Sequence, residues 1–490
     1  MINPKYLAPL TATIWLIPAA AIAAEPPYPL LDVNPIDPVI LMPPTATPPT
    51  TDITTEMAVE IDTYLQAHHD LRRFSGTVLV IRDGVTLFAN SYGMADLAHQ
   101  VPNTLDTKFR IGSITKQFTA AAILQLQDRG LLHVNAPLAT YLPDYPHEAV
   151  TLHHLLTHTA GVPNMTSFPD YPQWMRQPTT LDEVIARFVD RSLEFTPGEQ
   201  FSYSNSGYVL LTKVIEVVSG QPYDVYLQEW LFEPLGMENT GYEHPLAIID
   251  DMARGYIGSD DDGYQQAQYI NMAVPQGAGG LYATAGDLAR WNQFLFDGDR
   301  NPMILSEDAV TAMTAPAVQM DPENLDMFYG YGLIINQSEP HRTGHGGGIN
   351  GFVSSLGYRP EENQTLVILS NVATAGLDKI SGDLAAILAG EPYELPTLPD
   401  VVTVDPAIYE RYVGTYQLSP EFAIAITVES GQLYGQGTGQ PRLALYPSSE
   451  TEFFARAFEL QVTFNVDEDG AVESLTLLQG GQEMVAPRNP

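Results

Sequence analysis

The sequence contains no cysteine among its 490 residues. Without thiols the chain forms no disulfide, offers no thiolate to a metal ion and carries no lipid on an N-terminal cysteine. Its stability must therefore come from the burial of apolar side chains, and a hydrophobic content of 44% is ample for that.

Basic residues are also scarce. The chain has 22 Lys and Arg against 59 Asp and Glu, which gives a formal net charge of −37. This charge repels the phosphates of nucleic acids and anionic membrane surfaces, so we expect neither as a partner. The acids are dispersed along the chain, a pattern typical of adaptation to salt or of ordinary surface solubility.

The N-terminal residues 1–24 have the pattern of a signal peptide. A lysine precedes an apolar run, residues 7–21, and small residues follow it. The run is short for a membrane span and is interrupted by Pro9 and Pro18, so we expect no stable membrane insertion. Residues 25–54 are rich in proline and threonine and are predicted to form a linker. We therefore expect a periplasmic or secreted protein.

Two predicted hairpins lie at opposite ends of residues 55–390. The first, 76–90, turns at Asp83–Gly84 between alternating apolar runs, and the second covers 351–370. A helical pattern precedes the first hairpin, and another, 377–388, follows the second. We predict an α/β domain whose antiparallel sheet is built from both ends, flanked by helices and interrupted by a helical insertion.

The end of the chain has a different character. Residues 391–404 are proline-rich and are predicted to be a linker. Residues 405–490 contain short alternating runs separated by glycines, which indicates a small antiparallel β-sandwich or barrel. The predicted strands cover 423–428, 443–446, 460–466 and 474–478.

A serine and a lysine, Ser113 and Lys116, stand three residues apart before the apolar segment 117–129. At the start of a helix this spacing places both side chains on one face, so the amine can lie beside the hydroxyl. An adjacent base makes a serine nucleophilic, and Lys116 could be that base. The alternative is a helix N-cap followed by a surface lysine. Only four lysines follow the signal peptide, which favours the functional pair.

Tyr203 and Asn205 lie in a polar turn before a second apolar helix. Residues two apart in an extended turn point the same way. A phenol with a reference pKa of about 10 is a poor base at neutral pH unless a buried ammonium stabilises its phenolate. Lys116 and Tyr203 therefore form a plausible pair, although the same sequence also suits a simple capping turn.

His345 is followed by Gly346, Gly347 and Gly348. Glycines let backbone N–H groups approach a ligand, which suits an oxyanion hole. Some α/β-hydrolase esterases use His-Gly-Gly-Gly in this way, but the Gly-x-Ser-x-Gly elbow that their fold requires does not follow in this chain.

Three further histidines, His153, His154 and His158, include a pair at helical spacing. The glutamate of the His-Glu-x-x-His zinc pattern is missing. We therefore expect capping or packing roles for them, and neither a metal nor another cofactor.

These motifs, in this order and with the sequence between them, resemble the serine β-lactamase and penicillin-binding protein family, specifically its class C β-lactamase and D,D-carboxypeptidase-like branch. The resemblance covers most of residues 55–390 and includes 109–126, 155–162 and 279–288. Residues 405–490 resemble the lipocalin-like β-domains appended to some of these hydrolases.

The resemblance implies a serine hydrolase that works through an acyl-serine intermediate on a small molecule or peptide. The implied roles are the acylated nucleophile for Ser113, proton transfer for Lys116 and Tyr203, orientation of Lys116 and a substrate amide for Asn205, and an oxyanion hole made by the backbone N–H groups of Ser113 and Gly348.

One motif departs from the family's β-lactamases, which usually carry Lys-Thr-Gly where this chain has His345-Gly346-Gly347. The departure resembles D-aminopeptidase and esterase members. We expect His345 and Gly347 to contact substrate, and a neutral imidazole holds a carboxylate less strongly than an ammonium does. D-amino-acid peptides or esters are thus expected to be better substrates than β-lactams. The alternatives are a penicillin-binding sensor that is acylated without turnover and a true class C β-lactamase.

Overall fold

The computed structural model describes residues 52–489, apart from 245, 260–262, 299–300 and five short gaps near the C-terminus. The predicted signal peptide, 1–24, and the predicted linker as far as residue 51 lie outside the described residues. Helix α1 begins at Asp52, so the linker predicted to reach residue 54 ends earlier than expected. The gaps near the C-terminus are 420–421, 439–441, 457–458, 468–469 and 480–481.

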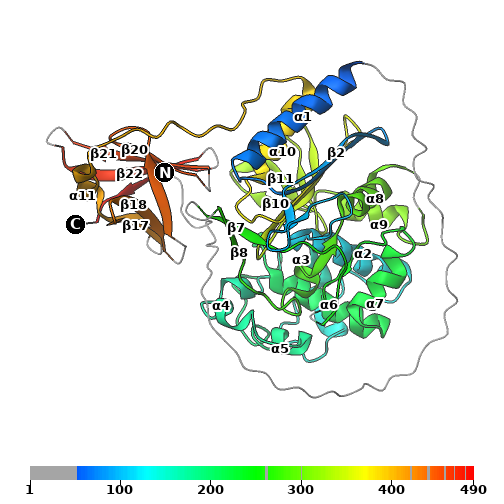
Figure 1. The fold of residues 1–490 in the computed structure, drawn as a ribbon. Helices are drawn as coiled ribbons and strands as arrows, with labels where there is room; N and C mark the ends of the chain where they lie inside the picture. Colours follow the sequence, from blue (N-terminus) through cyan, green and yellow to red (C-terminus); the bar gives the residue numbers. More distant parts are fainter. Residues whose placement is uncertain are drawn as a thin grey trace.

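One eight-stranded antiparallel sheet organises the first domain (Figure 1). Its strand order is β10-β11-β12-β13-β14-β15-β1-β2. β1 pairs with β15 along its whole length, with Gly76 opposite Ser370. The two predicted hairpins are β1–β2 and β14–β15, and their pairing confirms a sheet built from both ends of the domain. The strands are β1 Gly76–Arg82, β2 Val85–Tyr92, β10 Val318–Asp321, β11 Asn324–Tyr329, β12 Ile334–Asn336, β13 Arg342–Ile349, β14 Phe352–Arg359 and β15 Gln364–Ser370.

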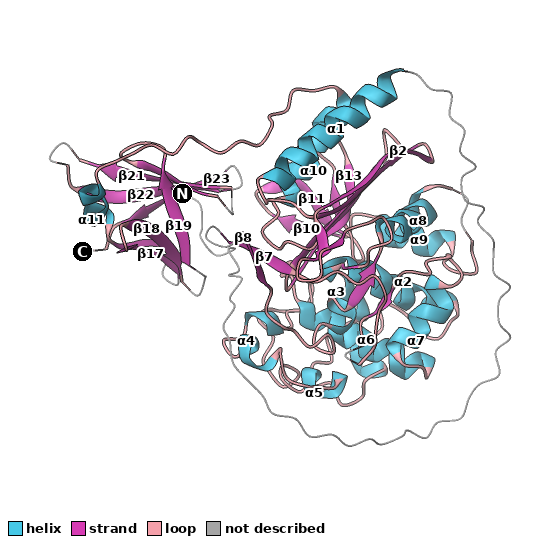
Figure 2. Ribbon diagram, in the orientation of Figure 1, coloured by secondary structure: helices cyan, strands magenta, loops and turns pink. Residues whose placement is uncertain are grey.

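Helices cover both faces of this sheet (Figure 2). Because side chains alternate along a strand, Val78 and Val80 of β1 pack towards α1 (Asp52–Asp70) and α10 (Leu377–Ala389), whereas Leu79 joins the core on the opposite face. The helix predicted over 377–388 is confirmed as α10, which ends at Gly390 in the left-handed conformation.

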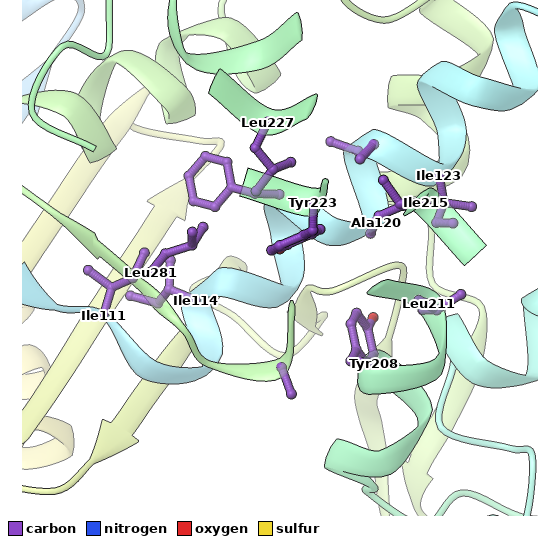
Figure 3. Packing of buried hydrophobic residues seen from close by; sticks show 14 of the residues in the cluster. Ile111, Ile114, Ala120, Ile123, Tyr208, Leu211, Ile215, Tyr223, Leu227 and Leu281 are labelled. Atoms are coloured by element: carbon purple, nitrogen blue, oxygen red, sulfur yellow. The ribbon is translucent and has the colours of Figure 1, made fainter. Parts of the chain in front are cut away.

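The chain between the two halves of the sheet forms mainly helices and loops, as predicted, and also short strands that were not predicted. Its central helix is α2, whose residues from Thr115 to Leu126 are all buried. In Figure 3 Ala120 of α2 lies beside Ile215 of α6. The helices are α2 Thr115–Asp128, α3 Leu152–Leu156, α4 Tyr171–Trp174, α5 Leu181–Ile185, α6 Asn205–Ser219, α7 Tyr223–Leu227, α8 Ala285–Phe296 and α9 Glu307–Thr314. The short strands are β3 Met94–Asp96, β4 Val101–Pro102, β5 Phe109–Arg110, β6 Gly241–Tyr242, β7 Tyr256–Ser259, β8 Gly263–Gln266 and β9 Leu281–Ala283.

The C-terminal part of the chain forms a second eight-stranded antiparallel sheet, in which each strand pairs with the next. A bridge between Tyr416 and Arg488 brings its first strand beside its end, so the sheet is a nearly closed barrel. Tyr412, Tyr416 and Phe464 belong to its separate hydrophobic core. A short helix, α11 Tyr409–Tyr412, precedes the strands β16 Gly414–Ser419, β17 Phe422–Glu429, β18 Gln432–Gly437, β19 Arg442–Pro447, β20 Glu452–Ala455, β21 Leu460–Val466, β22 Val472–Gln479 and β23 Gln482–Pro487.

The predicted strands of this part are confirmed as β17, β19, β21 and β22. The sequence pattern missed β16, β18, β20 and β23. β18, for example, reads Gln-Leu-Tyr-Gly-Gln-Gly, in which glycines and glutamines obscure the alternation. Its strand state comes from pairing with β17 and β19 on either side.

Candidate active site

Ser113 lies on a single 3₁₀ turn, Gly112–Ile114, directly before α2. The sequence pattern places it on the helix itself, and the structure differs by this one turn. Gly112 has φ 50°, and a Cβ there would stand 2.7 Å from the backbone nitrogen of Gly348. The turn therefore needs glycine both for its left-handed backbone and for its close approach to β13.

Lys116 is fully buried in the first turn of α2. Its Nζ lies 3.0 Å from Oγ of Ser113, 2.8 Å from Oδ1 of Asn205 and 2.7 Å from the carbonyl oxygen of Ala278. All three partners are uncharged, and burial lowers the pKa of Lys116 well below its ordinary value.

A neutral amine fits these three contacts fully. Its two N–H groups can donate to Asn205 Oδ1 and to the carbonyl of Ala278, both of which only accept hydrogen bonds. The nitrogen lone pair is then left for the hydroxyl proton of Ser113. The arrangement can therefore take a proton from Ser113.

Tyr203 lies just before α6, and its hydroxyl is hydrogen-bonded to Ser113. Its ring covers Nζ of Lys116, 4.8 Å from the ring centre. Burial raises the pKa of Tyr203 while it lowers that of Lys116. From the sequence, Tyr203 is predicted to act as a phenolate paired with the ammonium of Lys116. The structure instead favours the neutral forms of both groups, because burial penalises both charges.

Asn205, the first residue of α6, turns its Oδ1 towards Lys116. Its Nδ2 donates to Oγ1 of Thr166 at 3.2 Å, and its backbone N–H donates to Oδ1 of Asn164 at 3.1 Å. These contacts fix which end of the amide faces the lysine. The sequence pattern missed Asn164 and Thr166, which lie before and within a single 3₁₀ turn, Met165–Ser167, that is too short to carry a periodic signal.

The glycines of β13 lie flush against the turn that carries Ser113. A Cβ on Gly347 would stand 1.9 Å from the carbonyl oxygen of Ile111, so only glycine fits there. Ser354 of β14 donates to the same carbonyl at 2.8 Å and ties the turn to the sheet. This packing brings the backbone of Gly348 beside Gly112, the residue before Ser113.

His345 of β13 is buried, with 5% of its surface exposed. Its Nε2 lies 3.1 Å from the hydroxyl of Tyr329, and its Nδ1 lies 2.5 Å from the carbonyl oxygen of Gly346. Burial, together with the nearby Lys116, lowers the pKa of His345 to about 4. The sequence pattern predicts a substrate contact for this side chain, whereas both ring nitrogens have partners within the protein. The sequence pattern did not indicate that Tyr329 would contact His345.

The other three histidines have structural roles, which confirms the predicted capping and packing. His154 forms a capping box with Thr151 at the start of α3. His153 Nδ1 lies 2.7 Å from the hydroxyl of Tyr331, and the ring of His158 packs on Tyr203 with their centres 4.2 Å apart. Over the described ranges, no group of three or more His, Asp and Glu side chains is placed to hold a metal ion.

No helix in the part of the chain that the structure describes is both long and apolar enough to span a membrane.

The chain is similar to known proteins in sequence and in fold. A family model described as Beta-lactamase matches residues 61–391, and one described as a domain of unknown function (DUF3471) matches 398–486. The chain is similar to "Penicillin-binding protein 4*" of Bacillus subtilis, with 32% identity over 450 residues, covering 87% of this chain and 98% of that protein. It is 28% identical to a D-aminopeptidase of Gluconobacter oxydans over 342 residues, 69% of this chain and 62% of that protein.

A solved structure, that of the D-amino acid amidase of Ochrobactrum anthropi SV3 complexed with L-phenylalanine amide, superposes with a TM-score of 0.59. It has 25% identity and covers 69% of this chain and 99% of that chain.

Proposed function

The chain belongs to the Beta-lactamase family of serine hydrolases, and we propose that it cleaves amide or ester bonds of D-amino-acid derivatives in preference to β-lactams. The observation that carries this proposal is the pairing of Ser113 with a buried lysine whose other contacts leave a lone pair for the serine proton. The D-aminopeptidase and D-amino acid amidase relatives support the substrate class.

Acylation begins when Lys116 takes the hydroxyl proton of Ser113 and Oγ attacks the substrate carbonyl. The backbone N–H groups of Ser113 and Gly348 stabilise the negative charge that develops on the carbonyl oxygen. Tyr203 gives its proton to the leaving amine or alcohol and regains one from Lys116. A water molecule then attacks the acyl-serine by the reverse proton path, which frees the acid and restores Ser113.

The surroundings of His345 support the preference for uncharged groups at the leaving side of the substrate. Both ring nitrogens of His345 are engaged within the protein, and the neutral imidazole offers no cation to a substrate carboxylate. The lysine of a Lys-Thr-Gly motif would supply that cation. Penicillin-binding proteins are also relatives, so acylation by β-lactams without efficient turnover is the second candidate function.

The site of action that we propose is the periplasm or the exterior of the cell. The apolar N-terminal segment with small residues at its end supports export, and the absence of cysteine fits a protein that needs no reducing compartment. The proposed partners are small molecules or peptides, with no cofactor.

Substrate preference is the direct test. We expect kcat/KM for D-phenylalanine p-nitroanilide or a p-nitrophenyl ester to exceed that for nitrocefin by about tenfold or more, the effect of one missing charge-assisted hydrogen bond. The L-anilide is the matched control for stereochemistry. Dominant nitrocefin turnover would contradict the proposal, and a burst of one equivalent without steady turnover on all substrates would support the acylated sensor.

The pH profile tests the state of Lys116. Because the lysine acts in its neutral form and burial lowers its pKa well below 10.5, kcat/KM should reach its plateau far below pH 10.5 and fall as acid protonates the amine. His345, with a pKa of about 4, should add no inflection near pH 6.5. The substrate should be an uncharged ester, because its own ionisation then does not affect the pH profile of kcat/KM. If kcat/KM instead continues to rise through pH 10.5, the pKa of Lys116 is not lowered and this expectation is wrong.

A further inference from the structure

Tyr329 reaches the active site from two strands away. It is the last residue of β11, where it pairs with Ile334 of β12, and Ile334 in turn pairs with Gly344 of β13. This register puts Tyr329 level with the residue next to His345. The tyrosine is fully buried, and its hydroxyl lies 3.1 Å from Nε2 of the imidazole.

The contacts of His345 determine where its proton sits. Nδ1 faces the carbonyl oxygen of Gly346, which can only accept, so Nδ1 carries hydrogen. In a neutral ring Nε2 must then accept, and the hydroxyl of Tyr329 is its donor.

Protonation of the ring would not free Nε2. An N–H there would donate to the oxygen of Tyr329, whose own hydrogen could turn to its hydrogen-bond partner Tyr208. Tyr208 donates to the carbonyl oxygen of Leu156 at 2.8 Å, so this chain of hydrogen bonds ends on an acceptor. Nε2 of His345 is therefore occupied in either protonation state.

The groups that face His345 do not favour its charged form. Burial is the main factor that opposes protonation of His345, and Lys116 of α2 adds an electrostatic contribution when its amine carries a proton. Tyr203, Tyr329 and His158 provide aromatic surroundings: the ring of Tyr203 lies 6.2 Å and that of Tyr329 5.8 Å from the imidazole, and His158 lies 4.7 Å from Tyr329. The imidazole of His345 is thus neutral at neutral pH.

We propose that Tyr329 is a positioning residue that determines substrate specificity: its hydroxyl engages Nε2 of His345 and so prevents the imidazole from holding a substrate carboxylate. The substrate class that follows is amides and esters without a free carboxylate beside the scissile bond. This substrate assignment rests on the proposed function, whereas the engagement of His345 stands on geometry alone.

The test is the substitution Tyr329→Phe in the full-length protein. Phenylalanine keeps the ring that packs on His158 and Phe201 and removes only the hydroxyl. We expect kcat/KM for a D-dipeptide with a free carboxylate, relative to the matching D-amino-acid amide, to rise by about tenfold, mainly through KM and most strongly at acidic pH, where His345 can take up a proton.

Tyr331→Phe is the matched control, because it removes another tyrosine–histidine bond only two residues away. The hydroxyl of Tyr331 lies 2.7 Å from Nδ1 of His153, not from His345. This variant should leave the ratio of the two substrates unchanged. Equal changes in both variants would overturn the proposal.

An NMR measurement on the unmodified protein tests whether Tyr329 engages Nε2 of His345, and it does not depend on whether a variant folds. With ¹⁵N-labelled histidine, the signals of His345, assigned through His345→Gln, should show hydrogen on Nδ1 and a hydrogen-bonded Nε2 at pH 7.5. The signal of an Nε2 that makes no hydrogen bond would show that the proposal is wrong. If neither the unmodified protein nor the Tyr329→Phe variant hydrolyses an amide or ester, the proposed function is wrong. The NMR measurement still decides whether Tyr329 engages His345.

Discussion

The substitution Ser113→Ala is expected to abolish turnover of every substrate, with a loss of about 10⁶-fold as for removal of a nucleophile that acts as one unit with its base. Alanine keeps the 3₁₀ turn and its contact with β13 but leaves Lys116 without a proton to take. The variant should also lose labelling by a fluorophosphonate. Steady-state kinetics measure turnover, and mass spectrometry measures labelling.

Ser338→Ala is the matched control. Ser338 is an exposed serine that follows β12, and its hydroxyl donates to Oδ1 of Asn336 at 2.6 Å rather than contacting a lysine. Its removal should leave labelling and turnover unchanged. A labelled peptide that does not contain Ser113 would show that the nucleophile lies elsewhere.

The second large effect is expected from Lys116→Met, which replaces the amine by an uncharged chain of similar length. Without its base the reaction should slow by about 10³- to 10⁴-fold, and Tyr203→Phe should slow it by about 10²-fold. The double variant should be little slower than Lys116→Met alone, because both groups move the same proton and their effects are not additive.

Lys213→Met is the control for the lysine. Lys213 lies on α6 and pairs with Asp182 at 2.7 Å on the surface, so its loss should not change the rate. Methionine at position 116 also leaves the acceptors of Asn205 and Ala278 unpaired, so thermal unfolding must be recorded to separate stability from rate. Losses that multiply in the double variant would mean that Lys116 and Tyr203 act in separate steps.

The sheet of the first domain could be predicted because its signals are local. Asp83–Gly84 between two alternating runs predicts the β1–β2 hairpin, and Gly390 after an apolar helical pattern predicts the end of α10. In the barrel the weak alternation of strands such as β18 carried no such signal. Those strands form because their neighbours pair with them.

In the candidate site, too, the local contacts could be predicted from the sequence and the distant ones could not. The spacing of Ser113 and Lys116 predicts their contact, since one helical turn brings them together. Asn164 and Tyr329 could not be found, because each meets its partner only through the tertiary fold. The protonation of Tyr203 was missed for a related reason: the degree of burial decides it, and burial is not visible in a tetrapeptide.

The pairing of β1 with β15 also bears on how the chain is made. Gly76 meets Ser370, so strand β1 has to wait for its partner until almost the whole domain has left the ribosome. Contacts this distant in sequence form slowly and expose apolar strands meanwhile. The strand of glycines that completes the site, β13, is likewise synthesised long after Ser113. A nascent or truncated chain therefore holds the serine and lysine without the sheet that makes them reactive, so acyl transfer starts only once synthesis of the domain is finished.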